Sequence, residues 1–343
     1  MTTFSRASFC VLALTLALSG TVHAQTDATT TATTSAETAP IAPAADESWY
    51  EIEKIEGDID VGDFVVGPGK AELSVNPGDT IIQEITITNR ISELRTFKLT
   101  VDDITGSTDG SSAVSLTDGA RGPYSIRDYI SFPEDSITLG LGERARIPVK
   151  ITIPADAEPG GLYGSVLVST ERIPDASETE APRSPVIARI GSLFFVTVKG
   201  DIARAGQTLG IQTLDNKWWY EKGPINLGIT FENTGSVHVN TYGELSITNM
   251  FGEQVGFVEL EPWFVLPTSL RTRDVAWERE FLLGRYTVTA KINRGYDDIV
   301  DEVTTTFWVL PWKIVLGVFA ILFVLIFAFR TFFRTFEFSR KAK

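Results

Sequence analysis

Residues 146–153 read Arg-Ile-Pro-Val-Lys-Ile-Thr-Ile, and this stretch decides the fold class. An apolar side chain stands at every second position, and Arg146, Pro148, Lys150 and Thr152 stand between them. Successive side chains of a strand point to opposite faces of its sheet, so the alternation predicts a strand with one buried and one solvated face. Such one-sided burial is typical of antiparallel sheets.

The same period of two recurs on both sides of this stretch. It is found at 81–88 and 97–102 in the first half of the chain, and at 225–232 and 286–292 in the second half. Turn sequences such as Asn-Pro-Gly-Asp at 76–79 separate the alternating runs. No run with a helical period precedes the C-terminal apolar segment. We therefore expect an all-β fold: two tandem immunoglobulin-like β-sandwiches plus one C-terminal transmembrane helix.

Cysteine and histidine are too scarce for several kinds of chemistry. The 343 residues include one Cys and two His. Cys10 and His23 both lie in the first 24 residues, which we expect to be cleaved, so His238 alone remains. These numbers exclude a disulfide scaffold, a cysteine-based zinc site, an iron–sulfur cluster, a cysteine nucleophile and a two-histidine metal motif. No cofactor is expected.

Acidic side chains outnumber basic ones, 44 to 30, and the formal net charge is −14. The basic groups concentrate at the C-terminus. Residues 25–312 hold 43 acidic and 23 basic side chains, a net charge of −20. A surface this negative repels phosphates, so no nucleic-acid partner is expected.

The N-terminal residues 1–24 have the layout of a signal peptide. Arg6 precedes an apolar run at 9–18, and Ala24 supplies a small residue before the cleavage point. The run is shorter than the roughly 20 residues that cross a bilayer. The alternative is an uncleaved signal anchor.

A second apolar segment, 309–330, predicts a transmembrane helix. Its central residues 314–329 are uncharged and almost wholly apolar, and a basic tail follows at 331–343. Positive charge beside a span favours the cytoplasmic side. We therefore expect a single-pass protein of the cell membrane with an extracytoplasmic bulk and a cytoplasmic C-terminus. The residues expected at the membrane interface are Trp308, Trp312, Lys313, Arg330 and Arg334.

Composition divides the rest of the chain into three parts. A spacer at 25–57, rich in Thr, Ala and Pro, has too few large apolar groups to offset its ordering entropy and is expected to be disordered. The two immunoglobulin-like domains are expected at 58–200 and 201–308. The segments 105–124 and 171–185, rich in polar residues and Gly or Pro, predict long surface loops.

Several of these stretches resemble the WxL-interacting proteins of bacterial surfaces. In the first domain they are Leu-Ser-Val-Asn-Pro-Gly-Asp-Thr at 73–80, Ile-Thr-Ile-Thr-Asn at 85–89, and 153–164, which ends in Pro-Gly-Gly-Leu-Tyr-Gly. In the second domain they lie at 223–224, 231–238, 247–252, 265–269 and 284–286. The resemblance implies a first domain that binds peptidoglycan and a second that contacts a protein partner, with no catalysis.

Aromatic residues are the best candidate contacts, because their faces stack on sugars or anchor a protein partner. Trp218, Trp219 and Tyr220 form a triplet at the boundary of the two domains, in a polar context. Trp263 and Phe264 follow a proline in the second domain. The alternative is that these side chains pack the hinge or the second core.

Two acidic pairs and the remaining histidine are the other candidates for chemistry. Asp102 and Asp103 are adjacent, so a strand would send them to opposite faces, which disfavours a shared calcium ion. Glu259 and Glu261 have the spacing of two carboxylates on one strand face, as a glycoside hydrolase requires, but nothing in the sequence indicates a cleft around them. His238 is expected to pack at one end of a sandwich.

Together these patterns predict a protein that is not an enzyme. We expect a non-catalytic, membrane-anchored bacterial surface protein that binds cell-wall polymer (peptidoglycan) or a surface protein through its β-sandwiches. A scaffolding subunit of an envelope membrane complex is the alternative, and an envelope hydrolase is a weaker one.

Overall fold

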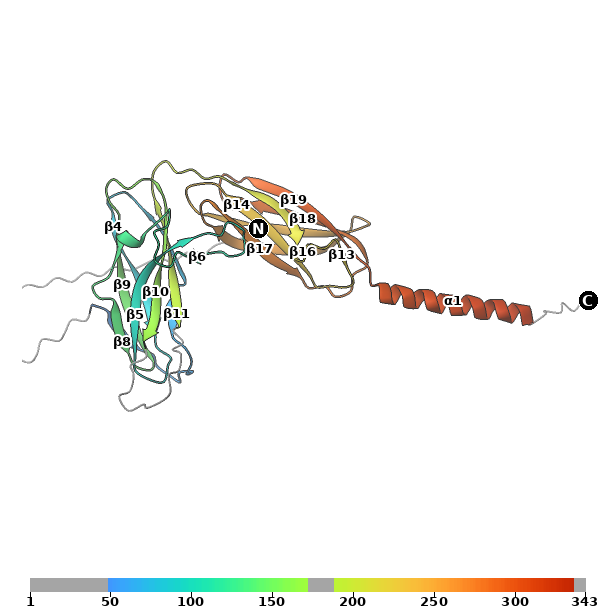
Figure 1. The fold of residues 1–343 in the computed structure, drawn as a ribbon, viewed down its shortest axis with the longest axis horizontal. Coiled ribbons are helices and arrows are strands. Elements are labelled where there is room, and N and C mark those ends of the chain that lie inside the picture. Colours follow the sequence, from blue (N-terminus) through green and yellow to red (C-terminus); the bar gives the residue numbers. More distant parts are fainter. Residues whose placement is uncertain (1–48, 172–187, 336–343) are drawn as a thin grey trace, which may run out of the picture. The chain divides into compact units, whose positions relative to one another are not determined.

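The computed structural model describes residues 49–171 and 188–335. The expected signal peptide, most of the expected spacer, nearly all of the loop expected at 171–185 and the end of the basic tail lie outside these residues. Within them, strands β1 to β11 form one pair of sheets, and strands β12 to β19 form another pair (Figure 1). The expected all-β class, with immunoglobulin-like sandwiches and one C-terminal apolar helix, is confirmed.

One sheet of the first sandwich has the strand order β1-β9-β4-β2, and β7 also pairs with β9. All of these pairs are antiparallel. The bounds are β1 (Glu51–Lys54), β2 (Val65–Gly67), β4 (Thr80–Thr88), β7 (Ile130–Ser131) and β9 (Glu143–Thr152). Strand β9 contains most of the alternating stretch 146–153. Its Ile147, Val149 and Ile151 are fully buried, which confirms the alternation.

The facing sheet has the order β3-β11-β10-β5-β6, and β8 also pairs with β5. Strand β3 is at the edge of this order and pairs with β11 in parallel. The bounds are β3 (Lys70–Val75), β5 (Arg95–Thr105), β6 (Ser115–Leu116), β8 (Ser136–Leu139), β10 (Gly160–Glu171) and β11 (Arg189–Val198). A short 3-10 helix, Arg127–Tyr129, precedes β7.

The second sandwich packs the sheet β12-β14-β17 against the sheet β13-β19-β18-β15-β16. Strand β13 pairs with β19 in parallel, and the other pairs are antiparallel. The bounds are β12 (Gly206–Thr213), β13 (Trp219–Tyr220), β14 (Ile225–Asn233), β15 (Val239–Asn249), β16 (Gln254–Val265), β17 (Ser269–Trp277), β18 (Gly284–Asn293) and β19 (Val300–Val309).

Each sandwich has its own core of residues from alternating strand positions. In the second core, the rings of Tyr286 and Phe307 stack with centroids 5.9 Å apart, and Trp277 meets Tyr286 edge-on at 5.3 Å. Burying one such large apolar side chain contributes about 1.5–3 kcal/mol. Because the two cores are separate, each sandwich is stabilised mainly by the packing of its own strands.

A buried asparagine ends one strand in each sandwich and holds the loop that follows. The Asn89 Nδ2 donates to the carbonyl of Leu139 at 2.8 Å, and its Oδ1 accepts from the Ile91 amide at 2.9 Å. Asn233 repeats this arrangement, because its Nδ2 donates to the carbonyls of Val237 and Val265. Both amides are fully buried and satisfied, so the loop after each strand has one defined path.

Two boundaries predicted from the sequence are wrong. The spacer expected to reach residue 57 contains β1, which pairs with β9 through its backbone although all four of its side chains are exposed. A pattern of buried side chains cannot reveal a strand whose side chains are all exposed. The segment 105–124, expected as a loop, contains β6, which pairs with the end of β5.

The apolar helix α1 comprises Trp312–Thr335. It begins three residues later than the expected start at 309, because Val309 is still paired in β19, and it extends past the expected end at 330. Within the described residues it is the one helix long and apolar enough to cross a membrane, with a mean hydropathy of 2.6.

Candidate functional site

The aromatic triplet at 218–220 lies in and before the short strand β13. The Trp218 side chain is 73% exposed, and Trp219 is 37% exposed. Tyr220 instead packs edge-on against Phe307 at 5.9 Å, on the margin of the second core. The structure therefore separates the triplet into two surface indoles and one packed phenol.

Trp263 and Phe264 are not surface contacts. Trp263 is 3% exposed and belongs to the second core, so its prediction as a ligand contact is wrong. The cause is the alternation of β16, which points Trp263 inward together with Val265. Phe264 is partly buried, and its ring meets Phe195 of the first sandwich at 4.9 Å. Trp263 therefore packs in the second core and Phe264 packs where the two sandwiches meet, as the alternative prediction states.

The residues expected at the membrane interface flank or belong to α1. Trp308 is on β19 and 45% exposed, and Trp312 is the first residue of α1. The Trp312 indole N–H donates to Glu221 Oε1 at 2.7 Å, and Lys313 Nζ lies 3.2 Å from the other carboxylate oxygen. These hydrogen bonds lower the pKa of Glu221. Arg330 and Arg334 lie on the exposed distal part of α1.

A third apolar cluster joins the two sandwiches. Its buried members are Ile104, Tyr163 and Phe195 of the first sandwich and Leu266 of the second. The ring of Phe264 packs against it and also lies beneath the Lys70 ammonium, 5.1 Å from its centroid. We refer to this cluster and the polar residues around it as the seam.

His238 lies in the seam, and the loop held by Asn233 brings it there. Its ring meets Phe195 at 5.1 Å and Tyr163 at 5.7 Å, both edge-on. The His238 backbone amide donates to the Tyr163 hydroxyl at 2.6 Å, and the Gly161 amide donates to the Ser236 carbonyl at 3.0 Å. The expected packing of His238 at a sandwich end is confirmed.

The segment after β5 crosses to the second sandwich and adds to the seam. The amide of Leu270 donates to the Ser107 carbonyl at 2.8 Å, and the amide of Thr272 donates to the Gly110 carbonyl at 3.2 Å. A Cβ added to Gly106 would lie 2.3 Å from the Ser269 hydroxyl oxygen, so the approach of the two chains requires glycine there. This part of the expected surface loop is an arm that pairs with β17.

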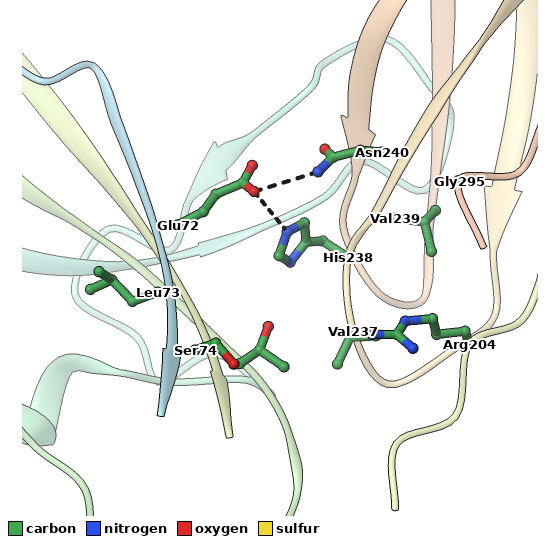
Figure 2. Close-up of a pocket in the computed structure, with 10 residues that line it drawn as sticks. Glu72, Leu73, Ser74, Arg204, Val237, His238, Val239, Asn240 and Gly295 are labelled. Atoms are coloured by element: carbon green, nitrogen blue, oxygen red, sulfur yellow. Dashed lines mark hydrogen bonds and ion pairs between the residues drawn. The ribbon is translucent and has the colours of Figure 1, made fainter. Parts of the chain in front are cut away.

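A polar pocket of about 380 Å³ opens at the edge of the seam. In Figure 2, Glu72 and Ser74 of β3 face Arg204, His238 and Asn240 of the second sandwich. Glu72 Oε1 accepts from Lys70 at 2.6 Å. Its Oε2 lies 3.5 Å from the Asn240 amide nitrogen and 3.8 Å from His238 Nε2. A carboxylate, an amide, an imidazole and a guanidinium thus converge on one cavity.

Burial and charge set the protonation states in this pocket. Desolvation lowers the pKa of His238, and the nearby Lys70 and Arg204 add to this effect while Glu72 opposes it. Burial by itself would raise the pKa of Glu72, but the hydrogen bond and charge of Lys70, with His238 and Asn240, outweigh it and lower the pKa. At neutral pH the pocket therefore presents an ionised carboxylate beside a neutral imidazole.

Of the two acidic pairs, Asp102 and Asp103 have structural roles, whereas Glu259 and Glu261 are exposed to solvent. The carboxylate of Asp102 pairs with Arg127 at 3.0 Å, and that of Asp103 accepts from the Gly122 amide at 3.1 Å. Glu259 and Glu261 are exposed on the outer face of β16. Within residues 49–171 and 188–335, no group of three or more His, Cys, Asp or Glu side chains is arranged to hold a metal ion.

The sequence did not single out Glu72, Asn240 or Arg204. Glu72 occupies an ordinary polar position of an alternating strand, and Arg204 lies between the two domains without a motif. These residues meet only because β3 lies at a sheet edge, beside the loop that contains His238. The available signal was in the resembling stretches at 73–80 and 231–238, because Ser74 of the first and His238 of the second line the pocket.

Comparisons with known proteins add likenesses of structure only. No family model matches the sequence, and no curated protein matches it. The class 5 fimbriae chaperone CfaA is 14% identical, with a TM-score of 0.36, over 72% of this chain and 100% of that one. The E. coli chaperone DraB is 12% identical, with a TM-score of 0.33, over 72% and 98%. A Pseudomonas aeruginosa chaperone is 9% identical, with a TM-score of 0.33, over 71% and 100%.

These three neighbours are named as chaperones. At such identities and TM-scores the likeness carries no argument about function. The fold class rests on the strand order and the burial described above.

Proposed function

We propose that this chain is a non-catalytic, membrane-anchored protein of a bacterial surface, and that its seam pocket binds cell-wall polymer of the peptidoglycan class. The pocket between the two sandwiches is the observation that carries the proposal. Its volume of about 380 Å³ falls in the usual range of ligand sites, and its lining is polar.

The chemistry of the pocket suits such a polymer. Peptidoglycan presents hydroxyl, amide, amine and carboxylate groups on one strand. Glu72 would accept from hydroxyl or amine groups, and Arg204, which has no ion-pair partner in the described part of the chain, would bind a carboxylate. Asn240 can donate to a carbonyl and accept from an amide. The pocket thus offers a partner for each group of the polymer.

The resemblance to WxL-interacting proteins supports the same ligand. The stretches that carry it include Leu73 and Ser74 on β3 and His238 in the loop after β14, all of which line the pocket. We propose membership of that family, with a wall-binding module that consists of the first sandwich and the pocket residues that the second sandwich adds to it. Anchoring through α1, with the bulk extracytoplasmic and the tail cytoplasmic, would hold the pocket on the wall side of the membrane.

Cosedimentation with purified peptidoglycan tests the proposal. The full chain in detergent micelles is mixed with isolated sacculi, and the bound fraction is measured for the wild type, Glu72→Gln and Arg204→Gln. We expect about a tenfold loss of affinity for each variant, because each removes a charge-assisted hydrogen bond. Glu259→Gln is the matched control, because this exposed glutamate lines a separate hollow on β16.

Two outcomes would contradict the proposal. Binding that is absent for the wild type would exclude the polymer. Binding that falls equally in Glu72→Gln and Glu259→Gln would indicate nonspecific attraction.

Crosslinking in intact cells tests the alternative of a scaffolding subunit, in which α1 and its tail bind the partner. If that alternative holds, replacing α1 and its tail with an unrelated anchor would abolish assembly of the complex but leave wall binding intact.

A further inference from the structure

Large apolar side chains are exposed at one end of the second sandwich, outside the seam pocket. Phe251 is 85% exposed, Trp218 73%, Phe281 65%, Met250 53% and Leu283 52%. Scattered exposed apolar residues need no explanation, but an exposed patch on one face marks an interaction surface. These residues lie in three separate loops, so their placement depends on the strand pairing.

The strand pairing brings these three loops to one end of the sandwich. Strand β18 begins at Gly284, which pairs with Val309 at the end of β19. A Cβ at Gly284 would lie 3.0 Å from the Met250 sulfur, so the turn that contains Met250 and Phe251 lies beside it. The amide of Gly223 donates to the Glu280 carbonyl at 3.2 Å, which joins the loop at 278–283 to the loop after β13.

The indole of Trp218 completes this end. The amide of Trp308 donates to the Trp218 carbonyl at 2.8 Å, and Trp219 is paired with Trp308. We call the group Trp218, Trp219, Met250, Phe251, Phe281 and Leu283 the apolar collar. Its members lie at the end of the sandwich where β19 ends.

Helix α1 leaves the sandwich at the collar. Only Leu310 and Pro311 stand between the end of β19 and Trp312, and the Trp312 indole is hydrogen-bonded to Glu221, one residue after β13 (Figure 1). A membrane around α1 therefore begins within a few residues of the collar. No linker is available to hold this end of the sandwich away from the bilayer.

The length of the uncharged segment brings the collar closer still. Residues 314–329 are uncharged, and sixteen helical residues span about 24 Å, less than the roughly 30 Å of a hydrocarbon core. Helix α1 as a whole is long enough to cross, but its charge-free stretch is shorter than the hydrocarbon core, so the residues that flank this stretch are drawn to the interface. The flanking residue at the N-terminal end is Lys313, and the collar follows directly.

Charge does not account for this surface. The segments 215–222 and 278–285 each contain two acidic and two basic residues and are neutral overall. The turn at 249–253 adds one acidic residue, Glu253, so the three loops together have a single unbalanced charge and offer no strong field to a charged partner. Trp is enriched at membrane–water interfaces, and Trp, Phe and Leu form the apolar face of segments that lie in the interface.

We infer that the apolar collar inserts into the headgroup region of the membrane that anchors α1, and that it seats the second sandwich directly on the bilayer. The inference rests on the membrane anchoring through α1 proposed above and is independent of the ligand proposed for the seam pocket. Neutral phospholipid is sufficient for this contact, since aromatic and aliphatic groups carry it.

Single labelled cysteines in the full chain test the inference. The one native cysteine is first replaced by Cys10→Ser, and Phe251→Cys or Phe281→Cys is then labelled with an environment-sensitive fluorophore. The labelled chain is reconstituted at low density in phosphatidylcholine vesicles. Leu209→Cys is the matched control, because Leu209 is 49% exposed and lies at the end of the second sandwich opposite α1. Its neighbour on β12, Thr208, donates its amide to Asp301, which stands near the start of β19.

We expect spin-labelled lipid to quench the labels at 251 and 281 about threefold or more over the label at 209, as interfacial burial implies. The result should be the same with and without anionic lipid. In the background of Phe281→Ser, the lipid quenching at 251 should fall.

Two results would overturn the inference. Equal access of an aqueous quencher to all three labels would show that the collar stands in water. Shielding from both lipid and aqueous quenchers would show that the collar is covered by protein instead.

Discussion

The hydroxyl of Tyr163 accepts a hydrogen bond from the backbone amide of His238 at 2.6 Å and lies 3.2 Å from His238 Nδ1. The two residues are 75 positions apart and belong to different sandwiches. Tyr163 is 1% exposed, and its burial raises the pKa of the phenol, so the hydroxyl stays protonated and can donate to the ring nitrogen while it accepts from the amide. This contact holds the loop that lines the seam pocket.

Removal of that hydroxyl should loosen the seam. Tyr163→Phe keeps the ring contacts with Phe195 but leaves the buried His238 amide without its acceptor, at a cost of about 1–3 kcal/mol. Thermal unfolding of the full chain in detergent should show a lower transition temperature. Tyr242→Phe, on an exposed tyrosine of β15, should leave it unchanged. Equal transition temperatures for all three proteins would show that the contact contributes nothing.

Acidification should also weaken the seam, through His238. Desolvation lowers its pKa below the ordinary value of 6.5, so the unfolded state binds the proton more readily than the folded state. Stability is therefore complete above pH 6.5 and falls as the pH drops toward the lowered value. Urea midpoints measured from about pH 8 down to about pH 5, above the range in which Glu72 titrates, should decrease. His238→Gln should flatten this slope, and an unchanged slope would assign it to other groups.

The arm after β5 should depend on a small residue at 106. Gly106→Ala places a methyl group 2.3 Å from the Ser269 hydroxyl oxygen and 3.2 Å from the Leu266 Cβ. The arm must then move away from β17, and its hydrogen bonds to Leu270 and Thr272 should weaken. Hydrogen exchange should show faster exchange of those two amides. Gly62→Ala, where an added Cβ meets nothing within 4 Å, should not alter them.

The pair of Asp102 and Arg127 should stabilise the first sandwich. Arg127→Ala leaves a mostly buried carboxylate without its charged partner, although the Gly119 amide still donates to it. We expect a loss of about 1–3 kcal/mol in the free energy of unfolding, measured with urea. Arg121→Ala removes a pair with Asp128 that is more than half exposed, and it should cost about 0–1 kcal/mol. Equal losses would contradict the role of burial.

Side-chain periodicity predicted the fold class correctly. It failed where backbone pairing determined a strand, and where tertiary packing determined whether a side chain is buried. Ile147, Val149 and Ile151 follow their predicted face because alternation in a strand is a local property. Strand β1 was missed because its side chains are all exposed. Trp263 was wrongly predicted as a surface contact because tryptophan occurs both in cores and on surfaces. Only the face of β16 on which it lies shows that it is buried.

The sequence by itself determined what depends on neighbouring residues: two sets of strands with one buried face each, a body of strongly negative charge, and a terminal helix apolar enough for a bilayer. Only the tertiary structure decided which residues meet across long separations. Glu72 and His238 come together, and Phe251 and Trp218 reach the same end of the second sandwich, through sheet order and loop packing, and no local pattern encodes that order. The pocket and the collar belong to this second class, because each is assembled from segments that share no sequence motif.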